Sequence, residues 1–221
     1  MYRIVNSDNS RSFPSPHDFI ASASRSESES EVRGGLVFTG IQAGRDYLRQ
    51  GSNPATFVAI ELELECLGVY TGLDHSEEHQ HTVGFARFRM GSAEPSQLIE
   101  LVRHAWTSDQ AVALARTAFE NSGLVVAICE DFPGRIVNTL IRPYLNAALS
   151  RLDEKLATAE DLDKTLCLGL GYPEGPIELL ARTGLAEHYD VTSALYFALG
   201  QESYAPARRA HVSKQRHKGI I

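Results

Sequence analysis

Three residues between positions 74 and 81 have the types and the spacing of a zinc site. His75, Glu78 and His79 fit the pattern H-x-x-E-H, in which two histidines one helical turn apart hold zinc beside a glutamate that acts as general base. The stretch is short and polar, and a strand pattern from Val83 to Phe88 follows almost at once. A hydrated loop or a short helix is the ordinary interpretation, and a zinc hydrolase is the competing hypothesis.

A second candidate is a phosphate-binding turn after a short strand pattern at residues 36–39. Gly40 and Gly44 lie between this pattern and a helical stretch, Arg45–Gln50. A strand, glycines and a helix in this order form the layout of a turn that binds phosphate at a helix N-terminus. The spacing is G-x-x-x-G rather than G-x-G-x-x-G, and no ribose-binding acid follows on a second strand at the expected offset. A tight turn is therefore favoured, with Gly40 and Gly44 kept as candidate cofactor-binding residues.

The elements around these residues have the pattern of an α/β fold. From Val58 to Cys66 apolar residues alternate with Glu61, Glu63 and Glu65, which predicts a strand with one face in water. Such a strand lies at the edge of a sheet or in a sheet that has lost helices from one side. Residues 98–103, 108–122 and 125–129 then read as strand, helix and strand, a βαβ unit.

The second half of the chain has the pattern of consecutive helices. Two adjoining i, i+4 rows of apolar residues predict a long helix from Pro133 to Leu156 with a kink at Pro143. A capping pattern that begins at Thr158 predicts a second helix, which ends near Gly169. A turn rich in glycine and proline follows and leads into a third helix near Pro176.

Composition limits the classes of protein. The chain has 221 residues, a net charge of −7, 43% apolar residues and 22% charged residues, which is typical of a globular protein and argues against a nucleic-acid partner for the chain as a whole. Three widely spaced cysteines, no apolar run of membrane-spanning length and no signal peptide favour the cytoplasm. The serine-rich residues 1–34 are expected to be a flexible arm with a short strand at Tyr2–Val5. The basic residues 208–221 are expected to be a disordered tail, and contact with an anionic ligand such as the CoA phosphates is the alternative.

Four linked motifs in the second half carry a resemblance to a known family. They read Pro133-Gly134-x-Ile136-Val137-Asn138, Arg142-Pro143-Tyr144, Ala157-Thr158-x-Glu160-Asp161-x-Asp163 and Gly169-x-Gly171-Tyr172-Pro173-x-Gly175-Pro176-x-Glu178-Leu179. In order and spacing they resemble the C-terminal domain of 3-hydroxyacyl-CoA dehydrogenases, and the resemblance covers roughly residues 98–207. It implies an α/β remnant of a Rossmann-like domain, then an all-α domain of the 6-phosphogluconate/3-hydroxyacyl-CoA dehydrogenase C-terminal type. The predicted boundaries are a truncated α/β domain at 35–131 and the helical domain at 132–207.

The resemblance also assigns residues to a catalytic network. Asn138 matches the family's motif asparagine, which holds the substrate, and Glu100 matches the glutamate that orients the catalytic histidine. Ala86 stands where that histidine is expected, in Gly84-Phe85-Ala86-Arg87-Phe88, and alanine cannot move a proton. A polar residue satisfied in a seam between domains is the alternative interpretation of Glu100 and Asn138.

The implied activity is NAD-dependent oxidation of 3-hydroxyacyl-CoA in the degradation of fatty or aromatic acids, as in β-oxidation. The alternative is a non-catalytic module of the same family that binds acyl-CoA or dimerises. The expected partners are acyl-CoA and either a second copy of the chain or a full-length dehydrogenase.

Overall fold

The fold was determined as a computed structural model, which describes residues 1–6, 9–23, 34–51 and 54–217. The chain divides into two compact units. Unit 1 comprises residues 1–89 and 94–136, and unit 2 comprises residues 90–93 and 137–221.

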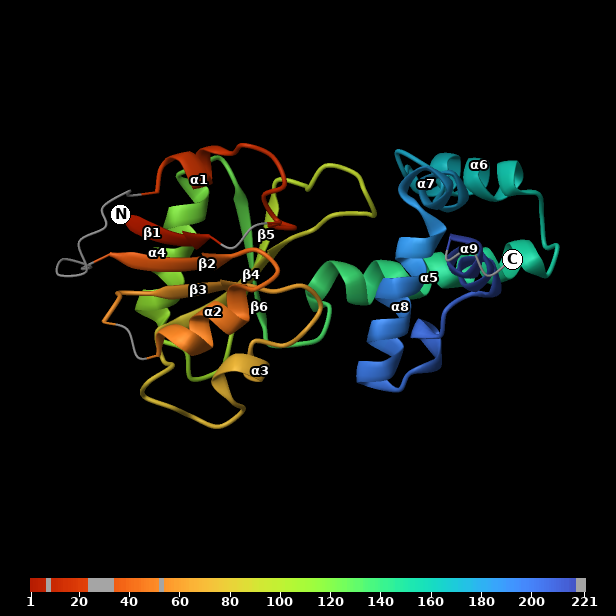
Figure 1. The fold of residues 1–221 in the computed structure, drawn as a ribbon. Helices are drawn as coiled ribbons and strands as arrows, with labels where there is room; N and C mark the ends of the chain where they lie inside the picture. Colours follow the sequence, from red (N-terminus) through yellow and green to blue (C-terminus); the bar gives the residue numbers. More distant parts are fainter. Residues whose placement is uncertain (7–8, 24–33, 52–53, 218–221) are drawn as a thin grey trace. The chain divides into compact units, whose positions relative to one another are not determined.

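Unit 1 is built on a six-stranded, mostly parallel sheet in which the strands follow one another in chain order (Figure 1). The strands are β1 (Tyr2–Asn6), β2 (Gly35–Thr39), β3 (Val58–Glu61), β4 (Thr82–Arg87), β5 (Leu98–Arg103) and β6 (Val125–Glu130). β1 to β4 are parallel, β5 pairs antiparallel with β4, and β6 pairs parallel with β5. The predicted βαβ unit is β5, α4 (Asp109–Glu120) and β6, and it is confirmed.

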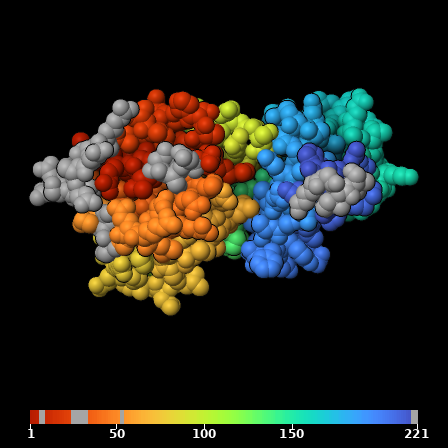
Figure 2. All heavy atoms as spheres, in the orientation of Figure 1, coloured from red at the N-terminus to blue at the C-terminus, as the bar shows by residue number. Residues whose placement is uncertain are grey.

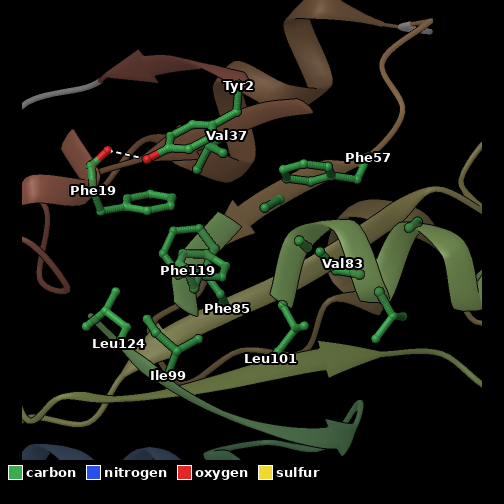
Figure 3. Close-up of a cluster of buried hydrophobic side chains, with 14 of the residues drawn as sticks. Tyr2, Phe19, Val37, Phe57, Val83, Phe85, Ile99, Leu101, Phe119 and Leu124 are labelled. Atoms are coloured by element: carbon green, nitrogen blue, oxygen red, sulfur yellow. Dashed lines mark hydrogen bonds between the residues drawn. The ribbon is translucent and has the colours of Figure 1, made fainter. Parts of the chain in front are cut away.

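Helices cover both faces of this sheet. One face packs on α1 (Asp18–Ala21) and α4 through a cluster rich in aromatic rings, in which Phe19, Phe85 and Phe119 are fully buried (Figure 3). The other face packs on α2 (Ala43–Gln50) and α3 (Gly68–Thr71). Side chains alternate across a strand, and β2 accordingly sends Val37 into the first cluster and its neighbours Leu36 and Phe38 into the second.

The prediction for residues 58–66 was wrong. β3 ends at Glu61, all four of its residues are buried, and the strand lies inside the sheet between β2 and β4. Glu61 is only 6% exposed. Its carboxylate accepts hydrogen bonds from the hydroxyl of Ser10 and from the backbone N–H groups of Ser12 and Gly40. A buried carboxylate is tolerated where donors satisfy it, and these donors come from distant parts of the chain.

The short strand expected at Tyr2–Val5 is confirmed, but the described residues after it differ from the expected flexible arm. Tyr2–Asn6 forms β1, and the hydroxyl of Tyr2 donates to the carbonyl oxygen of Phe19 at 2.6 Å (Figure 3). Phe13 and Phe19 stack on each other inside the core of unit 1. In Figure 2 the N-terminal residues, in red, cover one side of unit 1 beside the orange residues of β2 and α2. The serine-glutamate repeat at 24–31 lies outside the described residues.

Unit 2 is helical, as the motifs predict. Its helices are α5 (Arg135–Asp153, whose first two residues lie in unit 1), α6 (Ala159–Leu170), α7 (Pro176–Thr183), α8 (Leu185–Leu199), the short η2 (Glu202–Tyr204) and α9 (Arg208–His217). The hydroxyl of Thr158 caps α6 by accepting from the backbone N–H of Asp161 at 3.1 Å. Asp163 caps α7 in turn, because its carboxylate accepts from the first free N–H groups of that helix, those of Ile177 and Glu178.

The basic tail is a helix in the residues that the structure describes. Asp153 forms ion pairs with Arg208 and Arg209, and Lys214 pairs with Asp190 of α8, so α9 is fixed against its neighbours. Ala210 on its inner face is fully buried. The expectation of a disordered C-terminal end was therefore wrong for residues 208–217, which form α9. Among the described helices of both units, none is long and apolar enough to cross a membrane.

Candidate functional site

The site begins with two residues that the sequence placed together, Ala86 and Glu100. They are direct partners across the antiparallel pair β4–β5, and partners of this kind have their side chains on the same face. Both are buried, with Glu100 only 1% exposed. A side chain larger than alanine at position 86 would therefore lie beside the Glu100 carboxylate.

The carboxylate of Glu100 is already compensated by an arginine that the sequence analysis passed over. Arg135 Nε lies 3.7 Å from Glu100 Oε2, and the two side chains are 3% and 1% exposed. Arg135 also donates from its guanidinium to the carbonyl oxygen of Glu63. Burial lowers the pKa of Arg135, and the charge of Glu100 opposes that shift. The site that resembles a histidine–glutamate pair thus holds a guanidinium–carboxylate pair.

The backbone before α5 aims this arginine inward. Gly134 and Arg135 both have positive φ angles, 74° and 57°, a conformation that is uncommon for any residue other than glycine. The N–H of Gly134 donates to the carbonyl oxygen of Leu64 at 3.0 Å, which fastens the turn to the segment after β3. The same turn explains why α5 begins at Arg135 and not at Pro133. The helix ends at Asp153 and not at the predicted Leu156. Two residues after this end, Lys155 has a left-handed backbone conformation, with φ 60°.

Asn138 belongs to a second polar cluster, inside unit 2. Its side-chain oxygen accepts from Arg142 Nε at 3.0 Å. Arg142 donates to Nδ1 of His188 at 3.1 Å, and Nε2 of His188 lies 3.0 Å from the side-chain oxygen of Asn146. Asn146 donates to the carbonyl oxygens of Ser203 and Ala205. This chain of contacts joins α5, α8 and the segment around η2.

The protonation state of His188 follows from its partners. Burial, and then the charge of Arg142, lowers the pKa of His188 to about 3, so the imidazole is neutral near pH 7. Arginine only donates hydrogen bonds, so Nδ1 is the acceptor and Nε2 carries the proton toward Asn146. The cluster is satisfied within unit 2, and the substrate contact predicted for Asn138 stays a prediction. Glu100 lies in unit 1 and Asn138 in unit 2, so a network that joins them also stays a prediction.

The glycine turn after β2 does not fit a pyrophosphate. The N–H of Gly40, with φ 94°, donates to the carboxylate of Glu61 at 2.6 Å. A bound phosphate would replace that contact and meet the negative charge of Glu61 at close range. Gly44 has a packing reason instead, since a Cβ there would lie 2.0 Å from the ring of Tyr70. Both candidate cofactor-binding glycines are therefore explained without a ligand.

Residues 10–13 fill the same edge of the sheet, where the parallel strands β2, β3 and β4 have their carboxyl ends. Ser10 and Ser12 bind Glu61 at the end of β3, at distances of 2.6–3.0 Å. Arg87 at the end of β4 donates to the carbonyl oxygen of Ser12 at 3.0 Å and lies over the ring of Phe13. Ligands of open α/β sheets bind outside the carboxyl ends of the strands. Here part of that position is taken by the chain itself.

The candidate zinc residues do not form a site in the described structure. The segment is a turn and not a helix. The ring of His75 packs edge-to-face against the ring of Trp106. Nδ1 of His79 lies 2.6 Å from the hydroxyl of Tyr47. Among the described residues, no group of three or more His, Cys, Asp or Glu side chains has an arrangement that could hold a metal ion.

Sequence reasoning missed Arg135, Glu61 and His188. Arg135 follows directly after Pro133-Gly134, and a charged residue at the start of an apolar helix was a local signal that something must neutralise it. Glu61 stood in an alternating pattern whose ordinary interpretation was a solvated face. His188 lies in α8, outside the quoted motifs, and its partners come from α5.

Comparisons with known proteins give the family of the second half. Residues 134–219 match the model of the 3-hydroxyacyl-CoA dehydrogenase C-terminal domain. A probable 3-hydroxybutyryl-CoA dehydrogenase of Deinococcus radiodurans is 32% identical over 111 residues, which is 50% of this chain and 40% of that protein. A probable 3-hydroxyacyl-CoA dehydrogenase of Caenorhabditis elegans is 40% identical over 89 residues, 40% of this chain and 29% of that protein. The matches thus span less than half of the length of these relatives.

Solved structures show a similar fold over most of the chain. The (S)-3-hydroxybutyryl-CoA dehydrogenase of Ralstonia eutropha superposes on this chain with a TM-score of 0.68 and 21% identity. The superposition covers 84% of this chain and 65% of the Ralstonia eutropha chain. FadB2 of Mycobacterium tuberculosis gives a TM-score of 0.66 at the same identity, and covers 84% and 66%. At this level of identity the likeness concerns the fold, and it extends into the α/β unit.

Proposed function

Because residues 134–219 belong to the 3-hydroxyacyl-CoA dehydrogenase family as its C-terminal domain, we propose that this chain binds acyl-CoA without transferring hydride on its own. The observation that carries the proposal is the buried pair of Arg135 and Glu100 opposite Ala86. A general base must take up a proton. Alanine cannot do so, and an arginine side chain stays protonated in proteins.

The dinucleotide side supports the same proposal. NAD is the cofactor that the family implies, and a dinucleotide needs free backbone N–H groups around its pyrophosphate. At the candidate turn the N–H of Gly40 is held by Glu61, and residues 10–13 lie across the strand ends. We therefore expect no tight binding of NADH by this chain alone.

A second candidate is NAD-dependent oxidation of 3-hydroxyacyl-CoA in fatty-acid or aromatic-acid degradation, with this chain as part of a larger assembly. The names of the matched relatives, a probable 3-hydroxybutyryl-CoA dehydrogenase and a probable 3-hydroxyacyl-CoA dehydrogenase, support it. In that case a full-length dehydrogenase would supply the dinucleotide and the base. A homodimer formed through the helices of unit 2 is the other partner that we propose.

We also keep the expected domain boundaries, 35–131 and 132–207, as proposals. A location in the cytoplasm is proposed on the three cysteines, all of which are free thiols. Free thiols persist in a reducing compartment.

Separate titrations test the proposed function. 3-Hydroxybutyryl-CoA is added to the purified chain in a calorimeter, and NADH is added in a fluorescence titration. We expect heat from the acyl-CoA and no saturable NADH signal in the micromolar range. A micromolar Kd for NADH would contradict the proposal, and so would an absence of acyl-CoA binding.

A matched pair of variants locates the acyl-CoA contact. Asn138→Ala should weaken acyl-CoA binding by about tenfold, the equivalent of one lost hydrogen bond. Asn121→Ala removes an exposed amide at the end of α4 in unit 1, and it should leave the binding unchanged. Equal affinities for both variants would remove Asn138 from the proposed site.

A further inference from the structure

A basic groove lies along α9 in unit 2. It has a volume of about 600 Å³, which is within the range of about 300–1,000 Å³ that is typical of sites for small molecules. Leu185 at the start of α8 lines one side of it. The other lining residues come from α9 and are Arg208, Arg209, Val212, Ser213, Arg216 and His217. We call it the α9 groove.

The lining residues of α9 lie on one face of that helix. Side chains four residues apart share a face, and the lining residues form two adjoining rows with this spacing. One row is Arg208, Val212 and Arg216, and the other is Arg209, Ser213 and His217. Ala210 between the rows of the sequence is fully buried, and α9 packs along α8 (Figure 1). The polar side chains of the groove are therefore carried by a helix that is fixed within unit 2.

The groove has an excess of positive charge. Among the described residues that line it are three arginines and no aspartate or glutamate. Asp153 pairs with both Arg208 and Arg209, so one carboxylate serves two guanidinium groups. Arg216 has no ion pair with any described residue. The local charge is thus opposite in sign to the net charge of −7 of the whole chain, and an anion is the favoured ligand.

The donors of the groove narrow the anion to a phosphate. A guanidinium group presents its N–H groups in a planar fork that matches the oxygens of a phosphate. Arg209 contacts Asp153 through Nε at 2.6 Å, which leaves its two terminal nitrogens for a ligand. Ser213 adds a hydroxyl that can donate to the same ligand.

The spacing of the arginines predicts more than one phosphate group. Arg208 and Arg216 are eight positions apart, which corresponds to about 12 Å along a helix axis. Val212, which is 40% exposed, lies between them in the same row, and Leu185 adds a second apolar side chain. A molecule with phosphate groups at two separate positions and an apolar ring between them fits this pattern.

We propose that the α9 groove binds a nucleoside bisphosphate, with one phosphate group at Arg208 and Arg209 and the other at Arg216. The base packs against Val212 and Leu185. A nucleic-acid strand is the competing ligand, but a strand would continue beyond the groove over a chain with a net charge of −7. The proposal does not rest on the proposed function, because it needs neither an acyl group nor a thioester.

The test follows the backbone amide signals of α9 by NMR in the ¹⁵N-labelled full-length chain. The ionic strength is held constant, because salt screens contacts between exposed charges. The probes are adenosine 3′,5′-bisphosphate, AMP, adenosine, inorganic phosphate and a single-stranded oligonucleotide. The bisphosphate should shift the signals of Arg209, Ser213 and Arg216 with a Kd of about 0.1 mM, which is reasonable for a ligand of this size. AMP should bind at least about fivefold more weakly, because it lacks one of the two charge-assisted contacts, and adenosine should cause no saturable shift.

Two exposed arginines form a matched pair of variants. Arg216→Gln should weaken binding of the bisphosphate by about tenfold, the equivalent of one lost hydrogen-bonded charge contact. Arg116→Gln makes the same change of charge on α4, at a residue that does not line the groove, and should leave the affinity unchanged. The proposal is overturned if the bisphosphate causes no saturable shift in α9, if AMP or inorganic phosphate binds equally well, or if the two variants have equal affinities. Binding of the oligonucleotide alone would replace the small molecule by a nucleic acid.

Discussion

Arg135 and Glu100 form an ion pair from which water is almost fully excluded. Removing one partner of such a pair leaves a buried charge without compensation, at a cost of about 3–5 kcal/mol. Arg135→Leu should therefore lower the free energy of unfolding by about this amount in urea denaturation. Arg116→Leu breaks an exposed i, i+4 pair with Glu120 and should cost no more than about 0.5 kcal/mol. Equal losses for the two variants would contradict the importance of the buried pair.

The same pair changes what a restored histidine can do. An imidazole at position 86 would lie beside Glu100, but Arg135 already occupies that carboxylate. We expect no gain in hydride transfer from Ala86→His alone. Ala86→His combined with Arg135→Leu should raise the rate by about 10²-fold or more, provided that a full-length dehydrogenase supplies the dinucleotide. Robust turnover by the unchanged chain would point to another base, such as His81 or His104.

The Ala86–Glu100 relation was predictable because both residues lie in aligned motifs on strands. The role of Arg135 was not predictable, since it depends on a turn with two positive φ angles. That turn places the guanidinium beside Glu100 of β5. A one-letter pattern records the residue and not the direction of its side chain.

At the scale of elements, the sequence predicted best where the signal is local. The cap at Thr158 and the start at Pro176 both appear in the structure, because a cap depends on residues three positions apart. The strand at residues 58–66 failed because Glu61 is buried by donors that lie 21 to 51 residues away. A periodic pattern cannot report such distant partners.

His188 of α8, which is buried against Arg142 of α5, makes the free energy of unfolding depend on pH. Burial and the charge of Arg142 lower the pKa of His188 from 6.5 to about 3. Between these values the unfolded chain binds a proton that the folded chain does not. This contribution to stability is complete above pH 6.5 and is lost as the pH falls toward 3.

Urea denaturation at a series of pH values measures this effect. Within the window each pH unit costs up to about 1.4 kcal/mol. His188→Gln removes the titrating group and should give a shallower acid slope than the unchanged chain. Identical slopes would show that His188 is not responsible for the acid sensitivity.

At the scale of the whole molecule, the described surface of unit 2 retains many large apolar side chains. α6 has no buried residue, and it exposes Leu168 and Leu170 by 79% and 62%. Phe197 on α8 is 94% exposed. Exposed large apolar side chains are candidates for an interaction surface, and so we keep the homodimer as the expected assembly.

Sedimentation at high micromolar concentration tests that assembly. The unchanged chain should sediment as a dimer, because association would cover the exposed apolar side chains of unit 2. A stable interface typically buries about 1,200–2,000 Å² of surface. Leu168→Glu should shift it toward the monomer, because a charge would be buried without a partner. Leu73→Glu changes an equally exposed leucine of unit 1 and should leave the dimer intact. A monomer for the unchanged chain would contradict the homodimer, and a mixture with full-length 3-hydroxybutyryl-CoA dehydrogenase, sedimented in the same way, would then decide whether the helices of unit 2 bind that partner instead.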